Sequence, residues 1–299
     1  MIVVTGVSGG LGGAILGELR AVPGVEVAGA SSSGDGTTVR HADFDRPETL
    51  ERAFAGARVL MFVSAGYAED DVVLARHGAV VRAAADAGVD HVIYTSLAGS
   101  GERLTIALAH RWTEARLAEA PFDVTVLRNG LYAEIPAGLA LFGAAAAAES
   151  GVFAAPFGEG RVSVVARQDL ATVAARVAAQ AWRDVTSGGA RRHAGRTYEL
   201  EGLSTVGGHD LAEVLSEVMG RNITYQTVPL SQARAGLAGL EEYQVGHSIS
   251  TFANIGAGLL EARRSDLPTF VDTPRPARDL IAEAVRSGIS SGDRSASTR

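Results

Sequence analysis

A glycine-rich turn at the start of the chain constrains the fold more than any other feature of the sequence. Residues 2–5 form a short apolar run, glycines follow at positions 6, 9 and 12, and apolar side chains then recur at helical spacing at 11, 15, 16 and 19. In such a strand–turn–helix unit, Gly6 permits the tight turn, Gly9 lets the backbone approach a pyrophosphate, and Gly12 lets the helix pack against the strand. An ordinary glycine-rich turn is the alternative. We predict a dinucleotide-binding turn formed by Gly6, Val7, Ser8, Gly9, Gly10 and Leu11.

Strand-like runs alternate with helical patterns over the first 130 residues. The apolar runs are 2–5, 25–30, 37–42, 59–63, 89–95 and 124–127, and the helical patterns between them include 48–57, 72–81 and 107–120. This alternation predicts an α/β fold, a Rossmann-type doubly wound parallel sheet with right-handed crossovers.

The second half of the chain continues this pattern less regularly. We expect strands at 161–165, 197–200 and 223–228, helices at 168–181 and 209–219, a last helix through Leu280, Ile281 and Val285, and helix interior at the alanine run 144–148. The polar stretch 183–196 is expected to be a mobile surface loop. The predicted domains are a dinucleotide-binding Rossmann domain over 1–150, and the remaining sheet elements with a smaller substrate-capping lobe over 151–286. A disordered tail is expected over 287–299, where Ser, Gly, Asp and Arg dominate.

Composition excludes several kinds of site. The chain has no cysteine, which excludes disulfides and thiolate chemistry, and all 27 of its basic residues are arginine. A chain without lysine cannot form a Walker A lysine, a Schiff base or a Tyr-x-x-x-Lys dyad. The histidines lack metal-ligand spacing, so we expect no metal. The net charge of −7 argues against nucleic acid, and no apolar run is long enough to cross a membrane. With no secretory leader in view, a cytoplasmic protein is expected, and an oligomer is compatible with the sequence.

The end of the second predicted strand bears on the choice of dinucleotide. In a sheet of this type that end meets the adenosine ribose, where a carboxylate would bind the 2′-hydroxyl and repel a 2′-phosphate. Ser31, Ser32 and Ser33 supply hydroxyls there instead. The pattern favours NADP(H) over NAD(H), with a plain polar loop as an equal alternative. Ser64 and Ala65 end the fourth predicted strand at the edge where ligands bind, so they are expected at the cofactor as well.

Several short segments, taken together, carry a family resemblance. They are the opening Thr-Gly-x-x-Gly-x-x-Gly, Asp43-Phe44-Asp45, Tyr94-Thr95-Ser96, Ala109-His110-Arg111-x-Thr113-Glu114, Leu127-Arg128-Asn129-Gly130-x-Tyr132, Gly158-x-Gly160-Arg161 and Thr197-Tyr198-Glu199-Leu200. Over roughly residues 1–286 the chain resembles the NmrA-like, atypical short-chain dehydrogenase/reductase family, and within it the NADPH-dependent quinone oxidoreductase branch.

The resemblance implies a Rossmann domain with a small C-terminal lobe that forms a cleft over the nicotinamide. It implies hydride transfer from NADPH to a quinone without a flavin, with Asp43, Phe44 and Thr95 at the cofactor and Asn129 and Tyr132 at the substrate. Two features depart from that branch. Ile135 stands where the branch usually has asparagine, and the loop 183–196 is longer than usual. Both departures concern the substrate more than the cofactor.

The missing lysine also shapes the expected chemistry. Reducing a ketone generates a strongly basic alkoxide, so a positioned acid is required. Reducing a quinone gives a resonance-stabilised aromatic oxyanion, which needs orientation and a hydrogen-bond donor more than a strong acid. His110, whose ordinary pKa lies near neutrality, is the candidate donor, with Tyr94 and Ser96 as second catalytic candidates. The alternative for His110 is a helix histidine bonded to a neighbouring backbone group. Trp112 is either an aromatic wall for a planar substrate or part of the core.

These observations favour an NADPH-dependent reductase of a quinone or a related aromatic carbonyl compound, and a polycyclic aromatic quinone is a reasonable substrate. A redox sensor that binds NADP(H) and acts through a protein partner, without turnover, is the alternative. A nucleotide-sugar epimerase or dehydratase is a third interpretation, which the missing Tyr–Lys pair disfavours.

Overall fold

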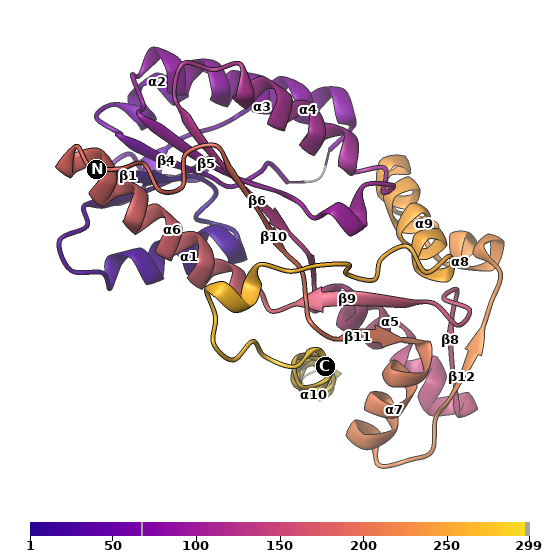
Figure 1. Ribbon diagram of the computed structural model, residues 1–299. Helices are drawn as coiled ribbons and strands as arrows, with labels where there is room; N and C mark the ends of the chain where they lie inside the picture. The colour runs from indigo at the N-terminus through magenta and orange to yellow at the C-terminus, as the bar shows by residue number, and fades with distance from the viewer. Residues whose placement is uncertain (67, 297–299) are drawn as a thin grey trace.

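A seven-stranded parallel sheet forms the centre of the molecule in a computed structural model that describes residues 1–66 and 68–296 (Figure 1). Its strands are β1 (Ile2–Val4), β2 (Val27–Ser31), β3 (Arg40–His41), β4 (Val59–Phe62), β5 (His91–Leu97), β6 (Asp123–Asn129) and β10 (Arg196–Leu200), in the order β10-β6-β5-β4-β1-β2-β3. The order reverses between β1 and β4, which is where ligands bind in open sheets of this type. The α/β, Rossmann-type fold predicted from the alternation is confirmed.

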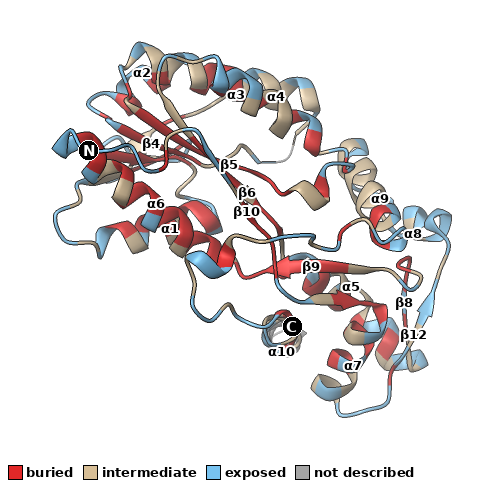
Figure 2. Ribbon diagram, in the orientation of Figure 1, coloured by how far each residue is buried: buried red, intermediate tan, exposed pale blue. Residues whose placement is uncertain are grey.

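Helices cover both faces of this sheet, as Figure 1 shows. On one face lie α1 (Gly10–Arg20) and α6 (Arg167–Ser187), and on the other lie α2 (Glu48–Phe54), α3 (Asp70–Asp86) and α4 (Ala107–Ala118). Successive strand residues point to opposite faces. Ile2 and Val4 therefore belong to the apolar cluster under α1 and α6, whereas Val3 belongs to the cluster under α2 and α3. Figure 2 shows the resulting burial along the strands.

A second group of elements forms a lobe beside the carboxyl end of the sheet. Its helices are α5 (Glu134–Ser150), α7 (Gly208–Met219), α8 (Leu230–Gly236), α9 (Glu242–Gly256) and α10 (Ala277–Ala296). Its strands are β7 (Leu131–Tyr132), β8 (Val152–Ala155), β9 (Arg161–Val165), β11 (Thr205–Gly207) and β12 (Thr224–Thr227), with short 3₁₀ turns η1 (Gly99–Gly101) and η2 (Leu267–Thr269) elsewhere. Small residues such as Ala140, Ala144 and Ala147 let α5 pack closely into the lobe core. The alanine run is helix interior, as predicted.

The chain crosses between the two parts more than once. The sequence places the boundary at residue 150, yet α5 precedes that position and packs in the lobe, whereas α6 and β10 follow it and belong to the large sheet. We propose that the two units are divided in space along this line and not by a single cut in the sequence.

The surface loop predicted over 183–196 is shorter in the structure, where only residues 188–195 lie between α6 and β10, and it is not exposed throughout. Helix α6 continues through Ser187, and Asp184 and His193 are both buried. Arg192 forms an ion pair with Asp184 at 2.7 Å, and the carbonyl of His193 accepts a hydrogen bond from Thr125 of β6 at 2.7 Å. The polar composition of this stretch predicts that it is exposed to solvent. In the structure these polar groups instead form hydrogen bonds and ion pairs with one another and with other parts of the fold.

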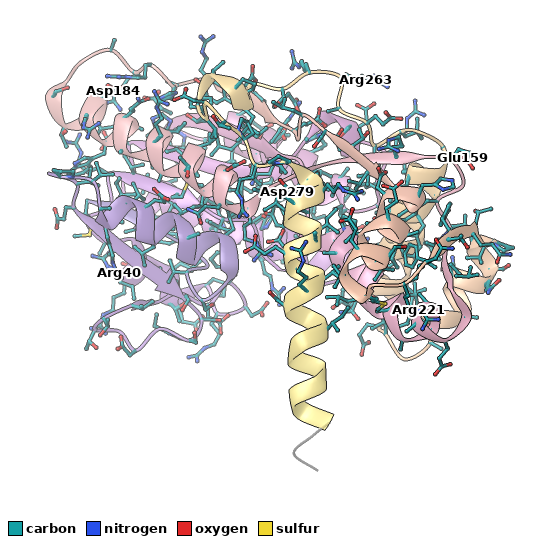
Figure 3. The ribbon with its side chains drawn as sticks, turned by 90° about the horizontal axis from the view of Figure 1, so that it is seen from below. Arg40, Glu159, Asp184, Arg221, Arg263 and Asp279 are labelled. Atoms are coloured by element: carbon teal, nitrogen blue, oxygen red, sulfur yellow. The ribbon has the colours of Figure 1, made fainter. Side chains whose placement is uncertain are left out.

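The tail also differs from its prediction. Residues 287–296 continue α10, because the helix is anchored by its apolar face, where Ile281 and Val285 are fully buried. Figure 3 shows α10 running from Asp279 along the body, with the far end of the helix extending beyond it. Residues 297–299 of the predicted tail lie outside the described residues. Within 1–66 and 68–296, no helix is both long enough and apolar enough to cross a bilayer.

Candidate active site

The glycine turn between β1 and α1 leaves the start of the helix open to an anion. Gly6 has a φ of +64°, a conformation that glycine adopts without strain, and the N–H of Gly9 donates to the carbonyl of Gly6 at 3.0 Å. Val7 lies in the same turn, and α1 begins at Gly10 without a side-chain cap. A Cβ atom on Gly12 would overlap the carbonyl oxygen of Gly6, so helix and strand approach closely. The N–H groups of the first turn can therefore bind an anion.

A cavity of about 250 Å³ opens beside this turn. Of the residues predicted at the cofactor, it brings together Gly6, Ser8, Ser31, Ser32, Asp43, Phe44, Ser64 and Ala65. Ser33 lies alongside, with its Oγ 3.2 Å from the Oγ of Ser31.

Two charged residues that line this cavity, Asp45 and Arg76, were not among the cofactor residues predicted from the sequence. Arg76 of α3 donates from Nε and Nη2 to the two carboxylate oxygens of Asp45, at 2.7 Å each. These hydrogen bonds hold the pKa of Asp45 below its usual range. The pair joins residues 31 positions apart, so no local pattern could have revealed it.

A larger cavity of about 480 Å³, here called the reacting cavity, lies where the sheet meets the lobe. It shares residues 63–66 with the first cavity, so together they form one elongated site. Its walls come from the carboxyl ends of β4, β5 and β6, from α3 and α4, and from α5 and α9 of the lobe. Of the predicted residues it brings together Leu11, Ser64, Ala65, Thr95, Ser96, His110, Asn129 and Tyr132.

The loop after β4, which both cavities share, is held by side chains from the neighbouring elements. The N–H of Ser64 donates to Oγ1 of Thr95, and the N–H of Ala65 donates to Nε2 of His77, each at 2.9 Å. His77 therefore carries its proton on Nδ1, which lies 2.7 Å from Oγ1 of Thr113. Burial lowers the pKa of His77 to about 3, so the ring stays neutral and keeps this acceptor. The sequence singled out Thr95 but not His77.

His110 lies in the wall of the reacting cavity and is oriented by Tyr94. The hydroxyl of Tyr94 is 2.8 Å from Nδ1 of His110, and Tyr94 itself is fully buried. Burial raises the pKa of Tyr94 far above its ordinary value, so the phenol keeps its proton and can donate it to Nδ1. We assign the neutral tautomer in which His110 carries its proton on Nε2.

The pKa of His110 departs from the near-neutral value expected from the sequence. Burial lowers it to about 4, and Arg111 acts in the same direction. At neutral pH the ring is therefore a hydrogen-bond donor and not an imidazolium acid. Tyr94 acts through His110, since its hydroxyl faces that ring.

Ser96 lines the reacting cavity but is tied to a network of charges. Its hydroxyl donates to Oε1 of Glu114 at 2.5 Å. Glu114 also accepts hydrogen bonds from Arg111 at 2.7 Å and from Nη2 of Arg128 at 2.6 Å. Burial raises the pKa of Glu114, but the hydrogen bonds from Arg128 and Ser96 outweigh it and hold that pKa below its usual range. The network fixes the carboxyl ends of β5 and β6 relative to α4.

The predicted substrate residues are only partly brought together. Asn129 and Tyr132 line the reacting cavity, and the guanidinium carbon of Arg167 lies 5.5 Å from the ring centre of Tyr132. Trp112 is elsewhere: its ring faces Gly78 of α3 and the guanidinium of Arg116. The proposed aromatic wall at Trp112 is therefore wrong, because residues two apart on a helix point in different directions.

Buried histidines make the fold sensitive to acid. Burial lowers the pKa of His77 to about 3 and that of His91 to about 4, whereas unfolded histidine titrates near 6.5. Below pH 6.5 the unfolded chain binds protons that the folded chain does not, so stability falls as pH drops from 6.5 towards 4.

We expect the free energy of unfolding to fall by about 1.4 kcal/mol per pH unit for each such histidine. Urea unfolding of the unmodified protein and of His91→Gln, at pH values between 7 and 4.5, checks this. The stability advantage of the unmodified protein should shrink as the pH falls. An advantage that stays constant with pH contradicts the assignment.

Three comparisons with known proteins bear on this site. A family model described as the NmrA-like family matches residues 1–266. Quinone oxidoreductase 2 of Escherichia coli is 33% identical over 247 residues, covering 79% of this chain and 81% of that protein.

Among described residues, no group of three or more His, Asp or Glu side chains that could hold a metal ion is present.

Solved structures match over almost the whole chain. A triphenylmethane reductase from a Citrobacter species, in complex with NADP(H), superimposes with a TM-score of 0.81 at 30% identity and covers 95% of this chain and 99% of its own. An NADPH-dependent quinone oxidoreductase of Escherichia coli, in complex with NADPH, has a TM-score of 0.80 at 29% identity and the same coverage.

Proposed function

Because the chain belongs to the NmrA-like family, we propose that it is an NADPH-dependent oxidoreductase that transfers a hydride to a quinone. Its relatives include a quinone oxidoreductase, a triphenylmethane reductase in complex with NADP(H) and an NADPH-dependent quinone oxidoreductase in complex with NADPH. The elongated site supports this proposal, since it joins a glycine turn, a pocket with serine hydroxyls and a mainly apolar reacting cavity.

The observation that carries the proposal is the neutral His110 in the wall of the reacting cavity. With Nδ1 engaged by Tyr94, the Nε2–H is the donor that this side chain can offer to a substrate oxygen. Because its pKa is low, His110 is neutral and is a poor acid for an enzyme that must protonate an alkoxide. Reduction of a quinone gives an aromatic oxyanion, which needs only a hydrogen-bond donor, and neutral His110 can supply that.

The chain's own residues fit a dinucleotide along the site. The glycine turn and the start of α1 would hold the pyrophosphate, and the pocket of Ser31, Ser32 and Asp43 would hold the adenosine. The loop at Ser64 and Ala65 would bring the nicotinamide to the reacting cavity, where NADPH, when bound, supplies a hydride. His110 donates a hydrogen bond to the quinone oxygen, and the aromatic oxyanion takes a proton from water to give the hydroquinone.

The direct test follows NADPH absorbance with the purified protein, with and without a simple quinone. We expect oxidation that depends on both protein and quinone and that needs no added flavin. Tight NADPH binding without turnover of any quinone would overturn the proposal and favour the non-catalytic sensor. Turnover of a cationic triphenylmethane dye but of no quinone would show that the substrates are dyes of this class and not quinones.

The serine pocket also predicts which dinucleotide is preferred. NADPH should bind more tightly than NADH, because serines stand at the end of β2, the position at which an acidic residue would bind the 2′-hydroxyl and repel a 2′-phosphate. We expect Ser32→Asp to reverse the preference, with a loss for NADPH of about tenfold or more. Dissociation constants for both cofactors check this, with Ser32→Ala as the control that removes the hydroxyl without adding charge. Equal affinities of the unmodified protein for both cofactors would contradict it.

A further inference from the structure

A third and smaller cavity adjoins the reacting cavity on the side of the lobe. It has a volume of about 30 Å³ and is lined mainly by residues of α5, β9 and α9. Its lining is apolar apart from one threonine: Leu131, Ile135, Pro136, Leu139, Phe157, Val162, Val164, Thr251, Phe252 and Ile255. The hydroxyl of Thr251 donates to the carbonyl of His247 at 2.9 Å, so its proton is already engaged. We call this space the apolar pouch.

Ile135 and Leu131 line both the apolar pouch and the reacting cavity. Ile135 is the second residue of α5, and 39% of it is exposed, partly to the reacting cavity that it lines. Its β-branched side chain has few rotamers, and the following Pro136 restricts its backbone. A rigid apolar side chain therefore stands between the two spaces.

The chemistry of the pouch decides what can enter past this side chain. A space of this size holds about two water-sized groups, which corresponds to a short alkyl group or the edge of a fused ring. The rings of Phe157 and Phe252, with centroids 6.1 Å apart, form an apolar floor. A charged or hydroxylated substituent would lose its water there, and the one side-chain hydroxyl of the lining, that of Thr251, already gives its proton to the carbonyl of His247.

We propose that the substrates of the reacting cavity are uncharged quinones with an apolar substituent or a second fused ring, and that Ile135 is the residue that determines this specificity. This inference rests on the proposed quinone reduction and narrows it. The substituent passes Ile135 into the apolar pouch, while the quinone oxygen stays at His110. The contact is apolar and serves binding, so its loss should appear in KM more than in kcat.

The test compares 2-methyl-1,4-naphthoquinone with 1,4-benzoquinone as substrates of the unmodified protein, Ile135→Asn and Ile135→Val. The asparagine variant should lower kcat/KM for the naphthoquinone about tenfold more than for the benzoquinone, mainly through KM, since one small apolar contact is worth roughly that factor. The valine variant should stay close to the unmodified protein. Using each variant's ratio between the two substrates cancels their different reduction potentials.

Two further measurements keep the outcomes distinct. Calorimetric binding of 1-naphthol and phenol to the protein with NADP⁺ should show the same selective loss in Ile135→Asn, without turnover. Phe142→Ala, a change on the exposed side of the same helix where Phe142 is 73% exposed, should change neither ratio. Equal losses for both quinones would overturn this inference and leave quinone reduction standing. No turnover of any quinone by the unmodified protein would remove the proposed function itself.

Discussion

Replacing Gly9 with valine is expected to weaken NADPH binding about 100-fold or more while the fold survives. The valine side chain would fill the space through which the turn approaches a pyrophosphate. The added Cβ would also lie 3.3 Å from the carbonyl oxygen of Gly6, a contact that a small shift can relieve. Fluorescence titration with NADPH measures the affinity, and thermal unfolding measures the fold.

Two glycines of the same helix provide matched controls. A Cβ atom added to Gly17 would meet no other atom within 4 Å, and this residue faces solvent, so Gly17→Val should leave NADPH affinity unchanged. Gly12→Val should destabilise the whole fold, because its Cβ would overlap the backbone of the preceding turn. Unchanged NADPH affinity in Gly9→Val would show that the phosphate site lies elsewhere.

Removal of the His110 side chain should lower kcat by about 100-fold, the scale of a lost hydrogen-bond donor at a developing oxyanion. NADPH affinity should hardly change, because the phosphates and the adenosine are held at the other end of the site. A quinone of high reduction potential should lose less activity than a poorer acceptor, since its anion needs less stabilisation. Steady-state kinetics of His110→Ala with two such quinones, together with NADPH titration, measure these effects.

Matched variants separate this role from a structural one. His110→Gln offers an amide donor and should recover part of the rate. Tyr94→Phe leaves the ring of His110 but removes the hydroxyl that fixes its tautomer, so kcat should fall by less than in His110→Ala. His209→Ala changes a histidine whose side chain is 63% exposed on α7 and should have no effect. An unchanged kcat in His110→Ala with both quinones would return His110 to the alternative, a structural helix histidine.

The large sheet could be predicted because its information is local. The central strands β1, β4 and β5 are buried along their whole length, and helical patterns separate the strand-like runs, so alternation implies a parallel sheet. Outside the large sheet, the lobe strand β9 was predicted over 161–165, with the bounds that the structure has. The glycine turn could be predicted for the same reason, because one helix start contains all its determinants.

The polar side chains that orient the site could not be predicted because their contacts span long distances in sequence. His77 accepts a hydrogen bond from the N–H of Ala65 and is hydrogen-bonded to Thr113. Arg76 pairs with Asp45, which lies 31 positions away in the sequence. The polar neighbours of His193 predict an exposed side chain, yet it is buried in the loop between α6 and β10, and Tyr198 and Gln180 hydrogen-bond both of its ring nitrogens. Of the two interpretations of Trp112, the aromatic wall could have been set aside from the sequence, since helical geometry already separates Trp112 from His110.

The central claim is that this protein moves a hydride directly from NADPH to a quinone in the reacting cavity. The measurement that tests it most directly is single-turnover oxidation of NADPH deuterated at one or the other of its two C4 positions, by the purified protein with a quinone and without a flavin. We predict that oxidation requires the quinone and slows when one of the two positions carries deuterium, but not the other. Oxidation no faster with quinone than without it, or insensitive to deuterium at either position in the hydride-transfer step, would contradict the claim.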